Sequence, residues 1–224
     1  MILRRSLIAL RKNLKTEAKY IITEWAKTEI RDFPWRSSSD PYMIMIAEFM
    51  LQRTKANQVV PVYEEFILRY PDVITLAKAN EKTVVKFTEH LGLHKRGTNF
   101  INAAKFIVNK YGGSFPSNRE ELLKIPGVGD YVAGAIMAVC FKNVDYVVDS
   151  NIARFINRYY GLELTGEIRR KKEIIEKAKG LFQVVNPGEF LFALIDFTSL
   201  ICKPRNPLCS ECPVKKIVII ENTV

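Results

Sequence analysis

Apolar residues recur every three or four positions along most of the chain, which is the spacing of an amphipathic α-helix. Strand-like runs such as Val147-Val148 are few. The pattern therefore predicts an all-α fold. The expected helices cover residues 1–27, 40–53, 57–70, 74–79, 82–91, 96–111, 117–124, 150–159, 169–182 and 187–201.

One proline and two glycines interrupt this pattern in the middle of the chain. Pro126 ends the helix over residues 117–124, because proline cannot continue a helix and disfavours helix in the residue before it. Gly127 and Gly129 permit a tight turn, and Asp130 is expected to cap a second, apolar helix. A helix N-terminus after such a turn presents backbone N–H groups to an anion. A turn that merely connects two helices is the alternative.

Charge and composition narrow the class of protein. The 34 Lys and Arg residues exceed the 24 Asp and Glu residues, which gives a net charge of +10. This excess favours a polyanion as partner, with a merely solubilising basic surface as the alternative. The 224 residues, 48% of them apolar, suffice for one large domain or two small lobes. No apolar run reaches the about 18 residues of a membrane span, and four cysteines without a secretory signal predict reduced thiols in the cytoplasm.

A sequence motif connects the glycine turn to an acidic residue. The hairpin Leu123-Lys124-Ile125-Pro126-Gly127-Val128-Gly129 is followed about twenty residues later by Val148-Asp149. This arrangement resembles the helix-hairpin-helix DNA glycosylases of the endonuclease III superfamily, and the likeness extends from Phe33-Pro34-Trp35-Arg36 to Cys212. The resemblance implies a monomeric base excision repair enzyme that acts on double-stranded DNA with a mismatched or damaged base. It also implies a prokaryotic, nucleoid-associated location.

The resemblance further implies two helical lobes with a DNA cleft between them. A six-helix lobe would span residues 32–142 and contain the helix-hairpin-helix at 117–140. The second lobe would combine residues 1–31 with residues 143–224 and carry a cysteine loop at 202–212.

Three residues are candidates for the catalytic site. Breaking an N-glycosidic bond builds positive charge on the sugar, and a fixed carboxylate can stabilise that charge or orient the attacking water. The resemblance gives this role to Asp149, whose position also suits a helix N-cap. Glu48 is the single carboxylate in the apolar run 42–51, where burial would raise its pKa toward that of a general acid. The resemblance assigns Glu48 to the base pocket, and a buried, partnered glutamate is the alternative.

Tyr131 occupies the position at which lyase members of the superfamily carry a lysine. A phenol cannot form a Schiff base, so the chain is expected to release the base and leave the backbone uncut; a packing residue is the alternative. Asp196, another carboxylate in an apolar helix, is interpreted as structural, capping the helix or pairing with an arginine.

The resemblance also implies contacts with DNA. Arg53 and Leu93 would fill the space that the flipped base leaves, although both also suit ordinary surface or core positions. Base flipping costs a few kcal/mol, so a residue that fills this space supports it. The DNA-binding residues expected from the resemblance are Gly127, Val128, Gly129, Arg53, Leu93, Lys203 and Arg205.

The C-terminal cysteines match an iron–sulfur loop incompletely. Cys202, Cys209 and Cys212 correspond to the first three cysteines of the family's loop, and Val218 stands where the fourth would follow. A [4Fe-4S]-type cluster ordinarily takes four thiolates. Three alternatives stay open: a cluster with another fourth ligand, a labile cluster, or a loop without a cluster. Zinc is disfavoured because no histidine follows His94.

Two branches of the superfamily fit the chain. The thymine mismatch branch, which acts on thymine or uracil opposite guanine, shares the Tyr after the hairpin and the Asn157-Arg158-Tyr159 sequence. The adenine branch acts on adenine opposite guanine or 8-oxoguanine. It usually has Asp-Gly-Asn in place of Asp149-Ser150-Asn151, and carries a further C-terminal domain for which the chain has no room. The sequence therefore predicts a monofunctional thymine/uracil glycosylase, with an adenine glycosylase as the alternative and a non-catalytic DNA-binding module as a third hypothesis.

Overall fold

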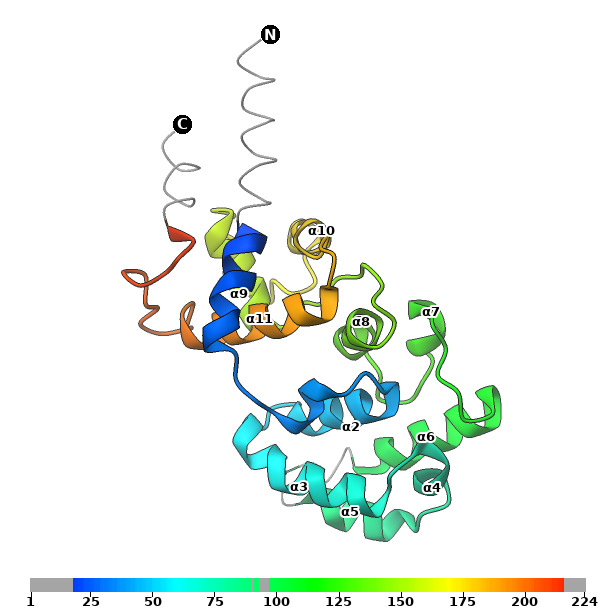
Figure 1. Ribbon diagram of the computed structural model, residues 1–224. Helices are drawn as coiled ribbons and strands as arrows, with labels where there is room; N and C mark the ends of the chain where they lie inside the picture. Colours follow the sequence, from blue (N-terminus) through cyan, green and yellow to red (C-terminus); the bar gives the residue numbers. More distant parts are fainter. Residues whose placement is uncertain (1–17, 90, 93–96, 216–224) are drawn as a thin grey trace. The chain divides into compact units, whose positions relative to one another are not determined.

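The computed structural model describes residues 18–89, 91–92 and 97–215 (Figure 1). None of these residues forms a β-strand, so the predicted all-α fold is confirmed. No described helix is long and apolar enough to cross a membrane. After a helix over residues 18–29, the elements are η1 (Pro34–Ser37), α2 (Pro41–Leu51), α3 (Ala56–Arg69), α4 (Val73–Ala77), α5 (Glu81–Glu89), α6 (Gly97–Tyr111), α7 (Arg119–Leu122), α8 (Asp130–Val139), α9 (Ser150–Tyr159), α10 (Lys172–Leu181) and α11 (Pro187–Leu200).

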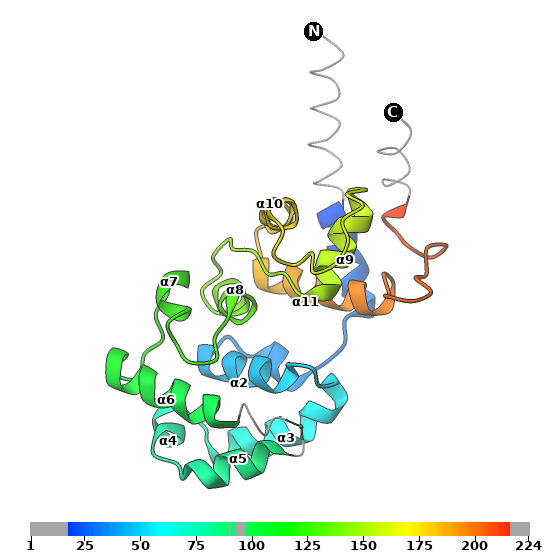
Figure 2. The ribbon, with the colours of Figure 1, turned by 180° about the vertical axis from the view of Figure 1, so that it is seen from behind.

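The chain divides into two compact units, whose helices can be followed in Figures 1 and 2. The first, here called the inserted unit, is the continuous segment Asp32–Phe141 and contains η1 and α2 to α8. The second, here called the split unit, takes its described residues from Met1–Arg31 and Lys142–Val224. It contains the helix over residues 18–29 and α9 to α11.

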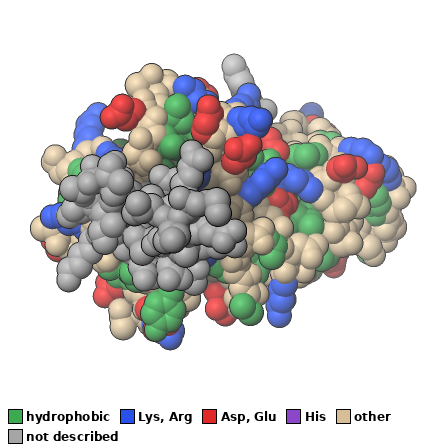
Figure 3. All heavy atoms as spheres, turned by 90° about the horizontal axis from the view of Figure 1, so that it is seen from above, with side chains coloured by type: hydrophobic (Ala, Val, Ile, Leu, Met, Phe, Trp, Pro, Cys, Tyr) green, Lys and Arg blue, Asp and Glu red, His purple; other side chains and the backbone are tan. Residues whose placement is uncertain are grey.

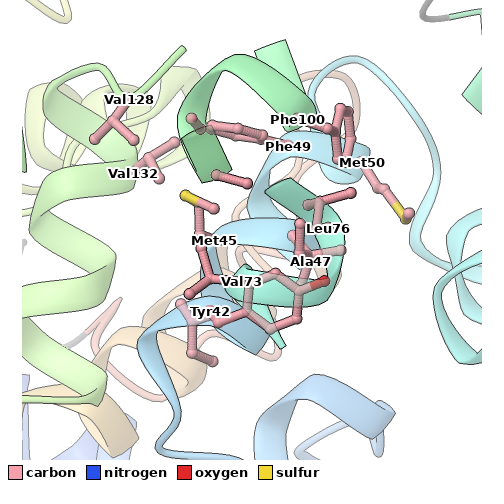
Figure 4. Packing of buried hydrophobic residues seen from close by; sticks show 14 of the residues in the cluster. Tyr42, Met45, Ala47, Phe49, Met50, Val73, Leu76, Phe100, Val128 and Val132 are labelled. Atoms are coloured by element: carbon pink, nitrogen blue, oxygen red, sulfur yellow. The ribbon is translucent and has the colours of Figure 1, made fainter. Parts of the chain in front are cut away.

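The core of the inserted unit is built around α2. This helix begins as the Asp-Pro pair predicts: Asp40 accepts a hydrogen bond from the Tyr42 N–H at 2.8 Å, and Pro41 occupies the first turn. Residues 44–50 are all buried, and α2 packs against both α3 and α8. A helix that is apolar all round is stable only when neighbours cover it, and each large side chain buried in this way contributes about 1.5–3 kcal/mol. Figure 4 shows Tyr42, Met45, Ala47, Phe49 and Met50 of α2 among Val73, Leu76, Phe100, Val128 and Val132.

The core of the split unit joins the N-terminal described helix to α9 and α11. The ring of Phe197 contacts Trp25 edge-on at 5.4 Å and Phe155 at 5.5 Å. Asp196 is fully buried, and it accepts hydrogen bonds of 2.8 Å from both Nε and the backbone N–H of Arg31. The interpretation of Asp196 as a structural carboxylate paired with an arginine is confirmed.

Two predicted features differ from the observed elements. The helix expected from Arg169 begins at Lys172, because the preceding residues form a turn in which Lys171 N–H donates to the Ile168 carbonyl at 3.1 Å. The strand-like pair at residues 147–148 is a partly buried connection that leads into α9. Residues 1–17 of the expected N-terminal helix lie outside the described residues.

Candidate active site and nucleic-acid interface

The glycine turn in the inserted unit joins α7 to α8. The turn is closed by a hydrogen bond of 3.0 Å from the Val128 N–H to the Ile125 carbonyl. Gly127 has a φ of +84°, and a Cβ atom there would approach Cβ of Asn99 to 3.0 Å and Cζ of Phe49 to 3.1 Å. Both the backbone conformation and the lack of space therefore require glycine at this position.

No side chain caps the first turn of α8. Gly129 is the N-cap residue and has no side chain to offer. The prediction that Asp130 caps the helix is wrong, because Asp130 is the first helical residue and its exposed carboxylate contacts Nη2 of Arg119 at 3.2 Å. The first-turn amides of α8 therefore keep the partial positive charge that attracts an anion.

Glu121 ties the hairpin to the end of α6. Its carboxylate accepts hydrogen bonds from Lys110 Nζ at 2.8 Å and Tyr111 Oη at 2.6 Å, and it also pairs with Lys124. The hydrogen bonds from Lys110, Lys124 and Tyr111 lower the pKa of Glu121 to about 2. The helix that enters the glycine turn is thus held by contacts within the inserted unit.

The inserted unit also carries two of the catalytic candidates. Glu48 lies on α2, is 7% exposed and has apolar neighbours on both sides in the sequence. Tyr131 lies in the first turn of α8 and is partly buried against the same core. Because α2 and α8 pack against each other, one rigid core supports both residues.

Asp149 is the N-cap of α9 in the split unit. Its Oδ1 accepts the Ile152 N–H at 2.7 Å, and its Oδ2 accepts a hydrogen bond of 3.1 Å from Nδ2 of Asn151. The side chain is partly buried. A carboxylate offers about four lone-pair sites, so these two bonds orient Asp149 and leave it acceptor capacity for a substrate.

A hydrogen-bonded chain of side chains connects Asp149 to the cysteine loop. Oδ1 of Asn151 accepts from Nη1 of Arg154 at 2.8 Å, and Nη2 of Arg154 donates to the carbonyls of Cys202 at 2.7 Å and Thr198 at 2.9 Å. Burial lowers the pKa of Arg154. These anchoring residues were not among those predicted from the sequence. The available signal was the spacing of two arginines four residues apart on α9, which places both on one face.

The second of these arginines holds the rest of the loop. Nη1 of Arg158 donates to the Lys203 carbonyl at 2.7 Å and Nη2 to the Pro204 carbonyl at 3.2 Å, while Sγ of Cys202 lies 3.6 Å from Nη1. The backbone of the loop is therefore fixed by contacts with protein groups. Lys203 is partly buried and Arg205 is exposed.

The three loop cysteines do not complete a four-thiolate site among the described residues. Cys209 is exposed, Cys202 and Cys212 are partly buried, and burial raises the pKa of the Cys212 thiol. No group of three metal-binding side chains that could hold an ion occurs in the described part of the chain. Position 218 lies outside that part. The residues present thus fall one donor short of the ligand set that a four-iron cluster uses.

Of the two residues expected to fill the space of a flipped base, Arg53 alone is among the described residues. Arg53 is exposed in the turn after α2 and has a φ of +63°, which is uncommon for a residue other than glycine. Oγ1 of Thr54 donates to the Leu91 carbonyl at 3.3 Å and joins this turn to the end of α5. Leu93 lies outside the described residues.

Comparison with known proteins places these features in a family. The HhH-GPD superfamily of base excision DNA repair proteins matches residues 46–183, and the iron-sulfur binding domain of endonuclease III matches residues 202–217. A thymine/uracil-DNA glycosylase of Methanothermobacter thermautotrophicus is 35% identical over 210 residues, which cover 93% of this chain and 95% of the relative. An adenine DNA glycosylase of Buchnera aphidicola is 33% identical over 185 residues, which cover 83% of this chain and 52% of the relative. The solved structure of a thermostable thymine-DNA glycosylase superposes with a TM-score of 0.87 at 33% identity, covering 92% of this chain and 96% of that structure.

The all-helical architecture and the glycine turn between α7 and α8, together with the family match, define a helix-hairpin-helix protein of DNA repair. The chain belongs to the HhH-GPD superfamily of base excision DNA repair proteins. The prediction of a DNA glycosylase, a hydrolase that acts on N-glycosidic bonds, is confirmed at this level of enzyme class.

Proposed function

We propose that this protein removes thymine or uracil paired with guanine by hydrolysing the N-glycosidic bond, and that it leaves the DNA backbone intact. The observation that carries the proposal is the carboxylate of Asp149, which the N–H of Ile152 and the side-chain amide of Asn151 hold in one orientation. A fixed anion is the group that a sugar with developing positive charge requires.

In this mechanism Asp149 acts on the sugar. As the bond to the base breaks, the sugar approaches an oxocarbenium ion, and the charge of Asp149 stabilises that state. The same carboxylate can accept a proton from the water that attacks the sugar carbon. Because the hydrogen bonds that orient Asp149 exist before DNA binds, little reorganisation accompanies the reaction.

Glu48 and Tyr131 are proposed to contact the extruded base. Glu48 is 7% exposed, and its carboxyl group can exchange a hydrogen bond or a proton with the departing base. Tyr131 stands where a lyase would carry an amine nucleophile. A phenol can pack against the base or donate a hydrogen bond to it, and it cannot form an imine with the sugar.

The glycine turn is proposed to hold a phosphate of the DNA. The uncapped amides at the start of α8 and the open space beside Gly129 support this role, since a phosphate can approach the backbone there without meeting a side chain. The Val128 N–H is bonded within the turn, and its side chain is buried, so Val128 contributes by shaping the turn.

Thymine and uracil are preferred to adenine as substrates for two reasons. The thymine/uracil relative is 35% identical over 93% of this chain, whereas the adenine relative is 33% identical over 83% of it. The residue after Asp149 is serine, where the adenine branch usually has glycine. The 33% identity with the adenine glycosylase keeps adenine as the second candidate substrate.

The proposal is tested with end-labelled duplexes that carry G·T, G·U or A·8-oxoguanine pairs, treated with alkali after incubation to reveal abasic sites. Strand breaks at the thymine and uracil positions are expected, and these should require the alkali step. Excision from the A·8-oxoguanine duplex alone would establish the adenine alternative. Binding to all three duplexes without excision would show a DNA-binding module.

A further inference from the structure

The connection from α9 to α10 folds back along α9. Nδ2 of Asn157 donates to the Leu164 carbonyl at 3.0 Å, and the Leu164 N–H donates to Oδ1 of Asn157, also at 3.0 Å. This pair of bonds fixes Leu164 beside the C-terminal half of α9. Figures 1 and 2 both show the yellow part of this connection lying next to α9.

The connection is long enough to return to the end of α9 that Asp149 caps. Asp149 precedes Asn157 by eight residues, which is about 12 Å along a helix, and five residues after Leu164 extend to at most about 18 Å. The pKa of Arg169 is raised, chiefly by its hydrogen bond with Glu167 and also by the charge of Asp149. Arg169 is therefore within electrostatic range of the proposed catalytic carboxylate.

Arg169 opens a run of four consecutive cations, Arg169-Arg170-Lys171-Lys172, here called the basic turn. Arg169, Arg170 and Lys172 are exposed and Lys171 is partly buried. Lys and Arg side chains mix with Asp and Glu on the face that Figure 3 shows, so net charge alone does not locate a DNA-binding surface. The location proposed for the DNA backbone follows instead from the basic turn being near Asp149.

Glu167 binds one edge of the Arg169 guanidinium, and the other edge is open to a further acceptor. Glu167 accepts from Nε at 2.8 Å and from Nη2 at 2.6 Å. Of the five N–H groups of a guanidinium, these bonds use two, and within the described part of the chain the Arg169 side chain donates to Glu167 alone. The remaining edge has the fork geometry that matches two phosphate oxygens. An exposed ion pair such as this one contributes little to stability by itself.

We propose that the basic turn binds the phosphate backbone of the strand that carries the extruded nucleotide, with Arg169 donating to a phosphate next to it. The inference rests on the proposed function, in which the sugar of that nucleotide lies against Asp149. Phosphates are attached to this sugar on both sides, so an exposed cation within electrostatic range of Asp149 can pair with one of them. Glu167 orients Arg169 for this contact.

The test measures binding to a duplex in which a tetrahydrofuran abasic analogue, which cannot be cleaved, stands opposite guanine. Dissociation constants are determined between 50 and 200 mM salt, about the range over which phosphate contacts are lost. Arg169→Gln is expected to weaken binding about tenfold at 50 mM salt. It should also reduce the slope of log Kd against log salt concentration by about 1. Arg169→Lys retains the charge, and is expected to retain the slope with an intermediate affinity.

Lys27→Gln is the matched control. Lys27 is an exposed cation of the same unit that pairs with Glu24 at 2.7 Å, so the variant also removes one positive charge and one ion pair. It should bind like the wild type. Equal slopes for Arg169→Gln and Lys27→Gln would overturn the inference.

A separate measurement of excision by the wild type keeps the two proposals distinguishable. An inactive wild type would overturn the proposed function, whereas a changed salt slope in Arg169→Gln would still establish the phosphate contact.

Discussion

The side-chain amide of Asn151 donates a hydrogen bond of 3.1 Å to Oδ2 of Asp149, the carboxylate that caps α9. The main-chain N–H of Ile152 meets the other oxygen at 2.7 Å. The same carboxylate thus begins a helix and carries the proposed chemistry. The two roles differ in what they need, because a cap requires an acceptor oxygen and the reaction requires a negative charge.

Asp149→Asn separates these roles. Asparagine caps helices about as well as aspartate, so the thermal unfolding temperature and the DNA affinity should change little. The variant lacks the charge, and single-turnover release of the base should fall by about 10²-fold or more. Excision by this variant at the wild-type rate would contradict the role of Asp149.

Asp72→Asn provides the matched control. Asp72 caps α4 by accepting the Thr75 N–H at 2.7 Å and has no proposed part in catalysis. Its replacement should leave the single-turnover rate unchanged. A comparable loss in both variants would mean that the effect comes from the cap.

Replacement of Tyr131 tests the absence of lyase chemistry. A lysine at this position supplies an amine that can attack the sugar carbon and form a Schiff base. Tyr131→Lys is therefore expected to give a covalent protein–DNA adduct on borohydride treatment, while the wild type gives none. Trapping of the wild type would show that another amine performs this reaction.

Loss of Arg154 should destabilise the split unit. The side chain donates to the carbonyls of Thr198, a buried residue, and Cys202, a partly buried one, and truncation leaves both acceptors without this donor. Arg154→Met is expected to lower the free energy of unfolding by about 2–4 kcal/mol, measured by urea denaturation. Arg158→Met is the comparison, since water can replace an exposed guanidinium and the expected loss is below about 1 kcal/mol. Equal losses would show that burial does not distinguish the two arginines.

The stability of the cysteine loop should depend little on a metal. Two arginines hold the loop backbone, and the described part of the loop supplies three thiols in place of four. Anaerobically purified protein is therefore expected to unfold at nearly the same temperature with and without an iron chelator. Iron and sulfide analysis of the same samples reports the cluster content. A cluster whose removal lowers the unfolding temperature by several degrees would contradict this expectation.

Glu121 predicts a pH dependence of stability. Its pKa in the folded state is about 2, below the usual value of 4.5, so its stabilising contribution is present above pH 4.5 and is lost as pH falls toward 2. Glu121→Gln should lower the unfolding temperature at neutral pH, and the difference from the wild type should shrink through this range. Glu120→Gln, a neighbouring change on the same helix, is the control. A difference independent of pH would mean that the ion pairs of Glu121 contribute nothing.

Periodicity and helix-stop signals predicted most of the helices, because the apolar faces that create the pattern are the faces buried in the two cores. Helix caps and turns that depend on a particular hydrogen-bond partner were harder to predict. Asp130 resembles an N-cap in sequence, yet Gly129 takes that position and Arg119 pairs with the carboxylate. The start of α10 was placed three residues early because charge and periodicity do not reveal the turn at Lys171.

In the candidate site, too, the residues could be predicted from the sequence but their hydrogen-bond partners could not. Motif spacing identified Asp149, Glu48 and the glycine turn as candidates. The hydrogen bonds of Asn151 and Arg154 could not be predicted, since they depend on how the cysteine loop returns to α9. A sequence records which groups are present, whereas the partners of long polar side chains are decided by packing between distant segments.

The pairing of Arg31 with Asp196 has a consequence for biosynthesis, because 165 residues separate the two partners. At about 5–20 residues per second, the ribosome adds Asp196 roughly 10–30 s after Arg31. The inserted unit, by contrast, is complete once Phe141 has been translated. The inserted unit can therefore fold while the partners of the helix over residues 18–29 have not yet been synthesised. During that period the apolar face of this helix is exposed and can bind a chaperone.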